Sequence, residues 1–387
     1  MKRMVCLGLV AILCLALIPF SAMAEETIKV GVIMDLTGPN SEWGSAQAWG
    51  VEHACEEYNA NGGINGYMLE PIVMDCASDA QTAVTAYRQL VDEYEVNVII
   101  GPAISNNVIP MAPLAEEDQI CVVGHFQDDR CTANEETGET WKYMFLTQPS
   151  SSQQGKLLAD YAYEVLGYKT FGALYDEGNA FAMSLFKPFA AAVEANEATE
   201  MLAAESFQST DADYRAQATK IAQANPDCVF LPNYAAASAL AYDQLREAGY
   251  AGTIIGANTL QQPFSTLCTT KVENVYLLQN YDHYSEKKNT TIVDAYKEFK
   301  GMNYYVGNSE FGYDDMVVVA EALKMMEDPT DSASLNQYLE KITDVQVNSF
   351  KISLNPETHR PSSLPMQIAT YDENKNLKIV DTYFLQG

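Results

Sequence analysis

The sequence predicts an α/β protein built as two doubly wound lobes, each around a mostly parallel sheet. Short apolar segments alternate with helical patterns along most of the chain, which is typical of parallel sheets covered by helices on both faces. More strands are expected than one sheet holds comfortably, and the alternation restarts near residue 150. The chain has 387 residues, 48% of them hydrophobic, and a chain of this length is expected to form two domains.

The first half of the chain shows the alternation clearly. Turn-forming residues at 59–66 separate a first helix from a second strand. Ser78 and Gln81 have the spacing of a capping box that opens a second helix. Strands are expected at 28–34, 71–76, 96–100, 121–123 and 143–146, with the first helix at 45–58.

The second half repeats this pattern and then changes character. Strands are expected at 170–175, 201–207, 227–231, 253–256 and 275–279, and helices at 152–166, 183–195, 213–224 and 235–248. Three helices follow, at 291–300, 314–327 and 334–342. Strands at 366–371 and 377–384, joined by five polar residues, predict an antiparallel hairpin at the end.

The first 24 residues have the features of a secretory signal peptide. Two basic residues precede an apolar run from Val5 to Phe20, and small residues precede Glu25. We expect cleavage after Ala24 and a periplasmic or extracellular location. A retained membrane anchor is the alternative, although the run is shorter than the ~20 residues that a spanning helix needs. Two cysteines in this region leave lipid anchoring open.

The net charge excludes one class of partner. The whole chain carries 23 basic and 52 acidic residues, a formal charge of −29. Loss of Lys2 and Arg3 with the signal peptide would leave 21 basic residues and a charge of −31. Such a surface repels phosphate backbones, so no nucleic-acid binding is expected.

Cysteine use leaves two interpretations open. An even number of cysteines in an exported chain permits disulfides, but the spacing contains no CxxC motif and does not reveal a pairing. Alternatively, these residues are small buried hydrophobic side chains. The six cysteines beyond the signal peptide are Cys55, Cys76, Cys121, Cys131, Cys228 and Cys268.

Common catalytic motifs are missing from the sequence. It contains no P-loop, no GxGxxG, no GxSxG and no HExxH, and its four histidines are scattered. A hydrolase would need a nucleophile and a base held together, so we predict no enzyme activity and no cofactor. The segment from Cys121 to Cys131 contains metal-binding residue types, but their spacing is irregular. We predict no metal there and expect this loop to contact a ligand.

Several segments together resemble one family. These segments are Ile28–Pro39, Asn59–Gly66 before a strand ending in Asp75, Ile100-Gly-Pro, Gln148–Gly155 and Asp227–Leu231. Together they resemble the branched-chain (Leu/Ile/Val) amino-acid-binding proteins, which are type I periplasmic binding proteins of ABC importers, over essentially all of 25–387.

The resemblance implies a two-lobed architecture joined by three hinge crossings, near residues 147, 280 and 352. The N-terminal lobe would comprise 25–147 and 281–351, and the C-terminal lobe 148–280 and 352–387. A cleft outside the carboxyl ends of the parallel strands would bind a small solute, and the lobes would close on it. The expected partners are the solute and the permease subunits of an ABC importer, with the chain acting as a monomer.

Ligand-binding residues can be carried over position by position. Ser105 falls at the hydroxyl beside a helix N-terminus that receives the ligand carboxylate, where free N–H groups favour an anion. Phe126 to Asp128 occupies a loop that contributes a backbone carbonyl and a Thr side chain, with Asp128 in place of the Thr. The aromatic positions of the family match Trp43, Tyr234 and Phe311.

One position departs from the family pattern in a way that concerns the ligand. Asn258 aligns with the Glu that accepts the ligand ammonium, and a neutral amide lacks the charge of a carboxylate. Either Asp128 supplies the missing charge, or the ligand has no α-amino group and is an amide, a urea-like molecule or an aromatic acid. A role as a ligand-presenting sensor subunit is the alternative to transport.

Overall fold

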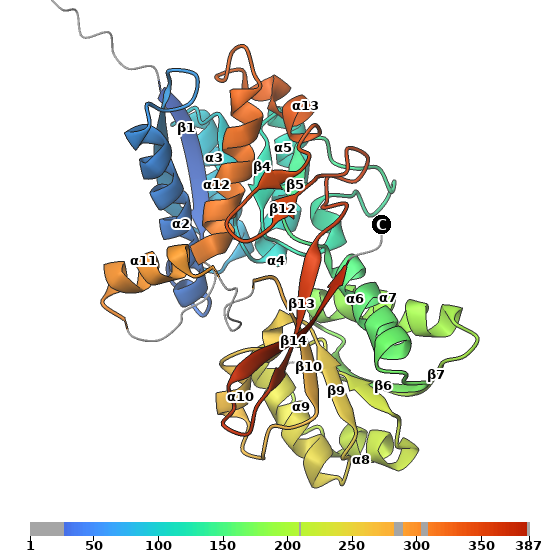
Figure 1. The fold of residues 1–387 in the computed structure, drawn as a ribbon. Helices are drawn as coiled ribbons and strands as arrows, with labels where there is room; N and C mark the ends of the chain where they lie inside the picture. The colour runs from blue at the N-terminus through green and yellow to red at the C-terminus, as the bar shows by residue number, and fades with distance from the viewer. Residues whose placement is uncertain (1–26, 209, 282–288, 303–308, 385–387) are drawn as a thin grey trace, which may run out of the picture.

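The computed structural model describes residues 27–208, 210–281, 289–302 and 309–384, arranged as two lobes around separate sheets (Figure 1). The first lobe has the sheet order β2-β1-β3-β4-β5, and the second has the order β14-β13-β10-β9-β8-β6-β7. The predicted α/β class with two parallel-sheet lobes is confirmed. The predicted signal peptide, residues 1–24, lies outside the described residues.

The N-terminal lobe contains five parallel strands. They are β1 (Thr27–Met34), β2 (Met68–Asp75), β3 (Val98–Ile100), β4 (Val122–Gly124) and β5 (Met144–Leu146). Its early helices are α2 (Ser41–Ala60), α3 (Ala80–Asp92), α4 (Ser105–Val108) and α5 (Ala112–Asp118), with 3₁₀ turns η1 (Ile109–Met111) and η2 (Asp129–Cys131). Later chain adds α11 (Thr291–Lys300), α12 (Ser309–Lys324), η5 (Ser332–Ser334), α13 (Leu335–Leu339) and the small pair β11 (Val345–Gln346) and β12 (Lys351–Ile352).

The start of α3 differs from the predicted capping box. The Asp79 carboxylate accepts a hydrogen bond from the Thr82 backbone N–H at 2.8 Å, so Asp79 is the N-cap. Ser78 has a φ of +56°, whereas an N-cap residue usually has an extended backbone. The backbone conformation therefore moves the helix start one residue beyond the predicted position.

Two glycines bring α2 and α12 into direct backbone contact. A Cβ added to Gly312 would lie 1.9 Å from the Gln47 carbonyl oxygen, and one added to Gly50 would lie 2.0 Å from the Ser309 carbonyl oxygen. Although 250 residues apart in sequence, the two helices lie side by side (Figure 1). This close crossing places Gln47 and Phe311 near each other at the same end of the lobe.

The C-terminal lobe repeats the N-terminal strand order and then extends it. Its parallel strands are β6 (Thr170–Asp176), β7 (Glu200–Phe207), β8 (Cys228–Phe230), β9 (Thr253–Gly256) and β10 (Val275–Gln279). The antiparallel strands β13 (Pro365–Tyr371) and β14 (Leu377–Phe384) form the predicted hairpin. The helices are α6 (Ser151–Asp160), π turn η3 (Tyr161–Val165), α7 (Ala180–Ala195), α8 (Arg215–Ala224), α9 (Ala235–Glu247), η4 (Asn258–Leu260) and α10 (Phe264–Leu267).

The described elements change lobe three times. The changes occur between β5 and α6, between β10 and α11, and between β12 and β13. The third change differs from the predicted boundary at 352, because the following segment still bonds to the N-terminal lobe. The Arg360 guanidinium pairs with Asp129 and donates to Thr132, and the His359 ring stacks on Phe145 at 4.0 Å. The chain leaves this lobe only after about Pro361, whose carbonyl accepts from Gln153 of α6.

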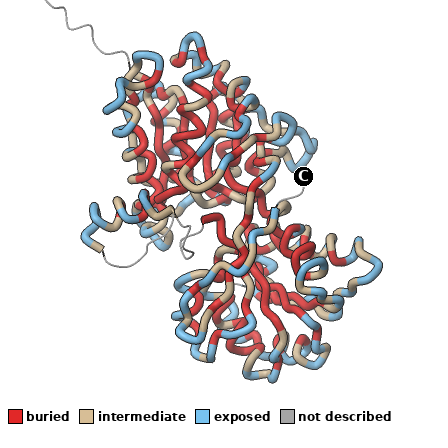
Figure 2. Tube along the Cα trace, in the orientation of Figure 1, coloured by how far each residue is buried: buried red, intermediate tan, exposed pale blue. Residues whose placement is uncertain are grey.

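Buried residues follow the two sheets and their covering helices (Figure 2). All six cysteines in the described ranges are buried free thiols, which favours the packing interpretation over disulfides. Burial raises the pKa of Cys55, Cys76 and Cys268 to about 12. None of the helices in the described ranges is long and apolar enough to cross a membrane.

Candidate ligand-binding site

A cleft between the lobes collects side chains from the carboxyl ends of both sheets. In each sheet the parallel strands reverse their order at one point, between β1 and β3 in the first lobe and between β6 and β8 in the second. Open α/β sheets bind ligands at such points. The first turns of the helices that follow these four strands, including the N-cap of α9, supply Trp43, Ser105, Phe181 and Tyr234 to the cleft.

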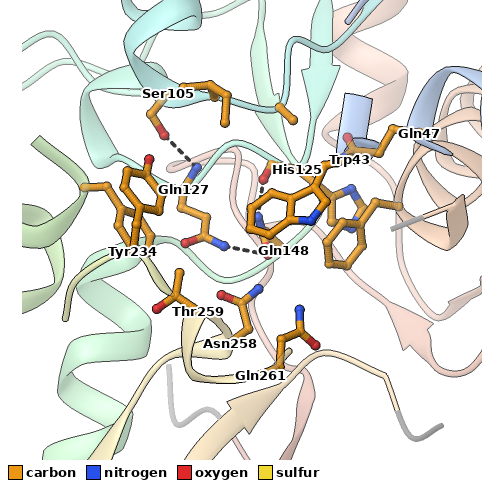
Figure 3. Close-up of a pocket in the computed structure, with 14 residues that line it drawn as sticks. Trp43, Gln47, Ser105, His125, Gln127, Gln148, Tyr234, Asn258, Thr259 and Gln261 are labelled. Carbon is orange, nitrogen blue, oxygen red and sulfur yellow. Dashed lines mark hydrogen bonds between the residues drawn. The ribbon is translucent and has the colours of Figure 1, made fainter. Parts of the chain in front are cut away.

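The interlobe cleft is bounded mainly by aromatic and amide side chains (Figure 3). It encloses about 560 Å³ of space between atoms, counting the part open to solvent. Within the described ranges, none of the residues that line the cleft is Asp, Glu, Lys or Arg. The lining comprises Trp43, Gln47, Ala103, Ile104, Ser105, His125, Gln127, Gln148, Phe181, Tyr234, Asn258, Thr259, Gln261 and Phe311.

Two aromatic stacks form apolar walls on opposite lobes. In the C-terminal lobe the Phe181 and Tyr234 rings stack with centroids 4.9 Å apart. In the N-terminal lobe the His125 ring stacks on Phe311 at 4.2 Å. Flat ring faces such as these suit an apolar or planar ligand body.

Tyr234 lies at the mouth of the cleft, with 37% of its surface exposed. Desolvation by the surrounding protein, together with the carboxylates of Asp35 and Asp128, raises the pKa of Tyr234 to about 12. Its hydroxyl is therefore protonated at neutral pH and is able to donate a hydrogen bond to a ligand.

Gln148, at the first passage between the lobes, organises a network of amides. Its Nε2 donates to the His125 backbone carbonyl. Its Oε1 accepts from Gln127 Nε2 at 3.2 Å and from Asn280 Nδ2 at 2.7 Å. Because Asn280 follows β10, the Gln148 side chain joins the first two passages between the lobes to the wall of the cleft.

His125 is held from behind by a buried carboxylate. Its Nδ1 lies 2.6 Å from Asp315 Oδ1 and 2.9 Å from Thr147 Oγ1, and the Thr147 hydroxyl donates to the same carboxylate. The residues His125, Thr147 and Asp315 are all buried. The opposite ring nitrogen, Nε2, is buried and has no hydrogen-bond partner among the described residues.

Ser105 presents a hydroxyl whose acceptor sites are occupied. Its Oγ accepts from the backbone N–H groups of Gln127 and Asp128, both at 3.1 Å. A hydroxyl has one proton and two acceptor positions, so the Ser105 proton is left to donate into the cleft. The predicted helix N-terminus beside it is short, since α4 contains only four residues.

The structure brings five of the seven predicted site residues to the cleft: Trp43, Ser105, Tyr234, Asn258 and Phe311. Phe126 is instead fully buried in the hydrophobic core. Asp128 is 2% exposed and pairs with Arg130 through both carboxylate oxygens, at 3.0 and 2.8 Å. Because neither side chain lines the cleft, the structure does not support a ligand-ammonium role for Asp128.

Sequence reasoning missed several polar residues of the lining. Gln127 and His125 lie in the loop that was expected to contact a ligand, but neither was singled out as a site residue. The signal available for Gln47, Gln148, Thr259 and Gln261 was their position near a strand end or a helix start. This signal is weak because polar residues are common at such positions.

The metal-binding residue types in the segment 121–131 are engaged elsewhere. His125 contacts Asp315, Asp128 pairs with Arg130, and Asp129 pairs with Arg360. Across the described ranges no group of three or more His, Cys, Asp or Glu residues is arranged to hold a metal ion.

Two lobes with a cleft between the carboxyl ends of their sheets define a solute-binding protein. The family model described as periplasmic binding protein matches residues 27–376, and the chain belongs to this family. The resemblance seen in the sequence is thereby confirmed.

Curated relatives are amino-acid-binding proteins. Leu/Ile/Val-binding protein homolog 3 of Brucella melitensis is 28% identical over 245 residues, 63% of this chain and 65% of that protein. The leucine-, isoleucine-, valine-, threonine- and alanine-binding protein of Pseudomonas aeruginosa is 24% identical over 71% of this chain and 72% of that protein. The matched region thus spans just under two thirds of the first relative.

Solved structures share the fold. The branched-chain amino acid transporter substrate-binding protein LivJ of Streptococcus pneumoniae, in complex with isoleucine, has a TM-score of 0.76. It is 23% identical, and the match covers 92% of this chain and all of that one. A leucine-binding protein of Thermotoga maritima has a TM-score of 0.78 at 22% identity, covering 92% of this chain and 98% of that one.

Proposed function

We propose that this chain is the extracytoplasmic solute-binding component of an ABC importer. It captures an amino acid or a similar small amphipathic solute in the interlobe cleft and presents it to permease subunits without chemical change. The observation that carries the proposal is the cleft itself, which both lobes line with aromatic rings and polar side chains.

The relatives support the type of ligand. Their names record leucine, isoleucine, valine, threonine and alanine as bound solutes, and solved neighbours include an ABC transporter substrate-binding protein from Desulfitobacterium hafniense. The aromatic stacks around Tyr234 and Phe311 suit the apolar body of such a solute.

Closure of the lobes is part of the proposal. The first two passages between lobes meet at Gln148 and Asn280. Bending at such passages brings the C-terminal face of the cleft down on a solute held by the N-terminal face.

Isothermal titration with candidate solutes, followed by recovery of the bound molecule, tests the proposal. We expect one solute bound per chain and recovery of that solute unchanged. At a hundred times its Kd, the solute should add about 2.7 kcal/mol to the free energy of unfolding. Chemical conversion of the recovered solute would contradict a binding role.

A further inference from the structure

The described lining of the interlobe cleft combines buried polar atoms with a lack of ionised side chains. Among the residues that the structure describes, this lining contains no carboxylate and no Lys or Arg. Yet four lining residues have a buried polar atom without a partner among the described residues: Gln47 Oε1, His125 Nε2, Gln127 Oε1 and Thr259 Oγ1. Buried polar atoms normally have hydrogen-bond partners, so these atoms point to groups on a ligand.

The orientation of the Gln127 amide follows from the network behind it. The His125 backbone carbonyl can only accept, so the Gln148 Nε2 must face it and the Gln148 Oε1 must face Gln127. Gln127 therefore donates its Nε2 to Gln148. Its own Oε1 is left as an acceptor at the cleft.

The same reasoning applies to His125. Its Nδ1 faces the Asp315 carboxylate, which accepts hydrogen bonds, and the Thr147 hydroxyl gives its own proton to that same carboxylate. Nδ1 is therefore the ring nitrogen that carries the proton. In the uncharged imidazole Nε2 is then an acceptor. Two atoms with assigned roles, His125 Nε2 and Gln127 Oε1, thus offer lone pairs to the cleft without a full negative charge.

A hydrogen-bond donor, the Ser105 hydroxyl at the start of α4, lies beside Gln127. The Ser105 hydroxyl accepts from the Gln127 backbone N–H and keeps its proton free to donate. A planar group with both a carbonyl oxygen and N–H protons fits this set, since its oxygen accepts from Ser105 and its N–H groups donate to Gln127 and His125.

We infer that the interlobe cleft is selective for an uncharged solute carrying a carboxamide or urea-type group on an apolar body. This inference rests on the proposed solute-binding function and narrows its ligand class. A zwitterionic amino acid fits less well, because its ammonium would be desolvated without a carboxylate partner among the described lining residues. The aromatic side chains Trp43, Tyr234 and Phe311 would contact the apolar body.

A panel of four molecules with one carbon skeleton tests the inference. The probes are 4-methylpentanamide, 4-methylpentanoate, leucine and 4-methylpentan-1-amine, with 3-phenylpropanamide, 3-phenylpropanoate and phenylalanine as an aromatic series. We expect the amide of at least one series to bind at least tenfold more tightly than its charged counterparts in titration calorimetry. Tighter binding of an acid, an amine or an amino acid than of its amide would overturn the inference.

A charge variant sharpens the test. Asn258 lines the cleft from the opposite lobe, where its side chain has no hydrogen bond to another described residue. Asn258→Glu should raise the affinity for leucine relative to 4-methylpentanamide by tenfold or more, and the size-matched Asn258→Gln should leave this ratio near its original value. Equal ratios in the two variants would overturn the claim that the neutral cleft selects against the ammonium.

The outcomes separate this inference from the proposed function. Tight binding of leucine by the unaltered protein would leave the solute-binding function standing and refute amide selectivity. The proposed function itself would be contradicted if no probe, charged or uncharged, raised the melting temperature and none caused the lobes to close.

Discussion

The two faces of the interlobe cleft differ in how their polar side chains are held. On the N-terminal face and at the first passage, His125, Gln127 and Gln148 belong to a continuous hydrogen-bond network that reaches Asp315 and Asn280. On the C-terminal face, four polar side chains make no hydrogen bond to another described residue: Tyr234, Asn258, Thr259 and Gln261.

This difference suggests an order of events. Groups that are already held lose little conformational freedom when they bind a ligand, so the networked face is suited to take up the solute first. The C-terminal face gains partners only when the lobes close. The comparison therefore predicts that substitutions on the networked face change both folding stability and affinity, whereas those on the opposite face change affinity alone.

The largest effect is expected for Gln148→Ala. This change leaves Gln127, Asn280 and the His125 carbonyl without a partner, and each unpaired buried group costs about 1–3 kcal/mol. We expect a loss of roughly 3 kcal/mol in the free energy of unfolding and at least a tenfold weaker ligand affinity. Urea unfolding and titration calorimetry measure the two quantities.

Tyr234→Ala is the matched change on the opposite face. Because Tyr234 is 37% exposed and contacts Phe181 mainly through its ring, we expect a stability change of about 1 kcal/mol or less. The affinity should still fall about tenfold. A stability loss as large as that of Gln148→Ala would remove the distinction between the faces.

A smaller effect, which depends on pH, is expected for Asp314→Asn, behind the networked face. Burial, more than the nearby Glu310 and Asp315, raises the pKa of the Asp314 carboxyl well above its ordinary value of 3.8. A group with a raised folded-state pKa stabilises the fold at low pH, and this stabilisation is lost as the pH rises toward the folded pKa.

The amide should reproduce the contacts of the protonated acid, which are a hydrogen bond from the Asn348 N–H at 2.8 Å and one with the Tyr281 hydroxyl at 2.8 Å. Asp314→Asn should therefore leave the melting temperature nearly unchanged at pH 4 and raise it by roughly 2 °C at pH 8. A destabilised variant at pH 8 would show that the carboxylate is ionised in the folded protein.

Much of the fold could be predicted because it depends on local pattern. The fully buried strand β3 appears in the sequence as a continuous apolar run, and the hairpin β13–β14 is marked by its turn residues. The third passage was placed too early because residues 354–361 carry no strand or helix pattern. Their position depends on side-chain contacts such as Arg360 with Asp129.

The candidate site was predictable only in part, for a similar reason. Trp43 and Ser105 follow strands whose carboxyl ends open on the cleft, so their positions followed from the order of elements. Asp128 lies on the expected loop, but its carboxylate turns to Arg130, two residues along the chain. The role of Gln148 depends on Asn280, 132 residues away, and no local pattern indicates that contact.

Small-angle X-ray scattering with and without saturating solute tests the central claim, that the lobes close on a ligand held in the cleft. The account predicts that the saturated protein has a smaller radius of gyration than the free protein. The Gln148→Ala variant should show no such change at a solute concentration that saturates only the unaltered chain. Identical scattering from the free and the saturated protein would contradict it.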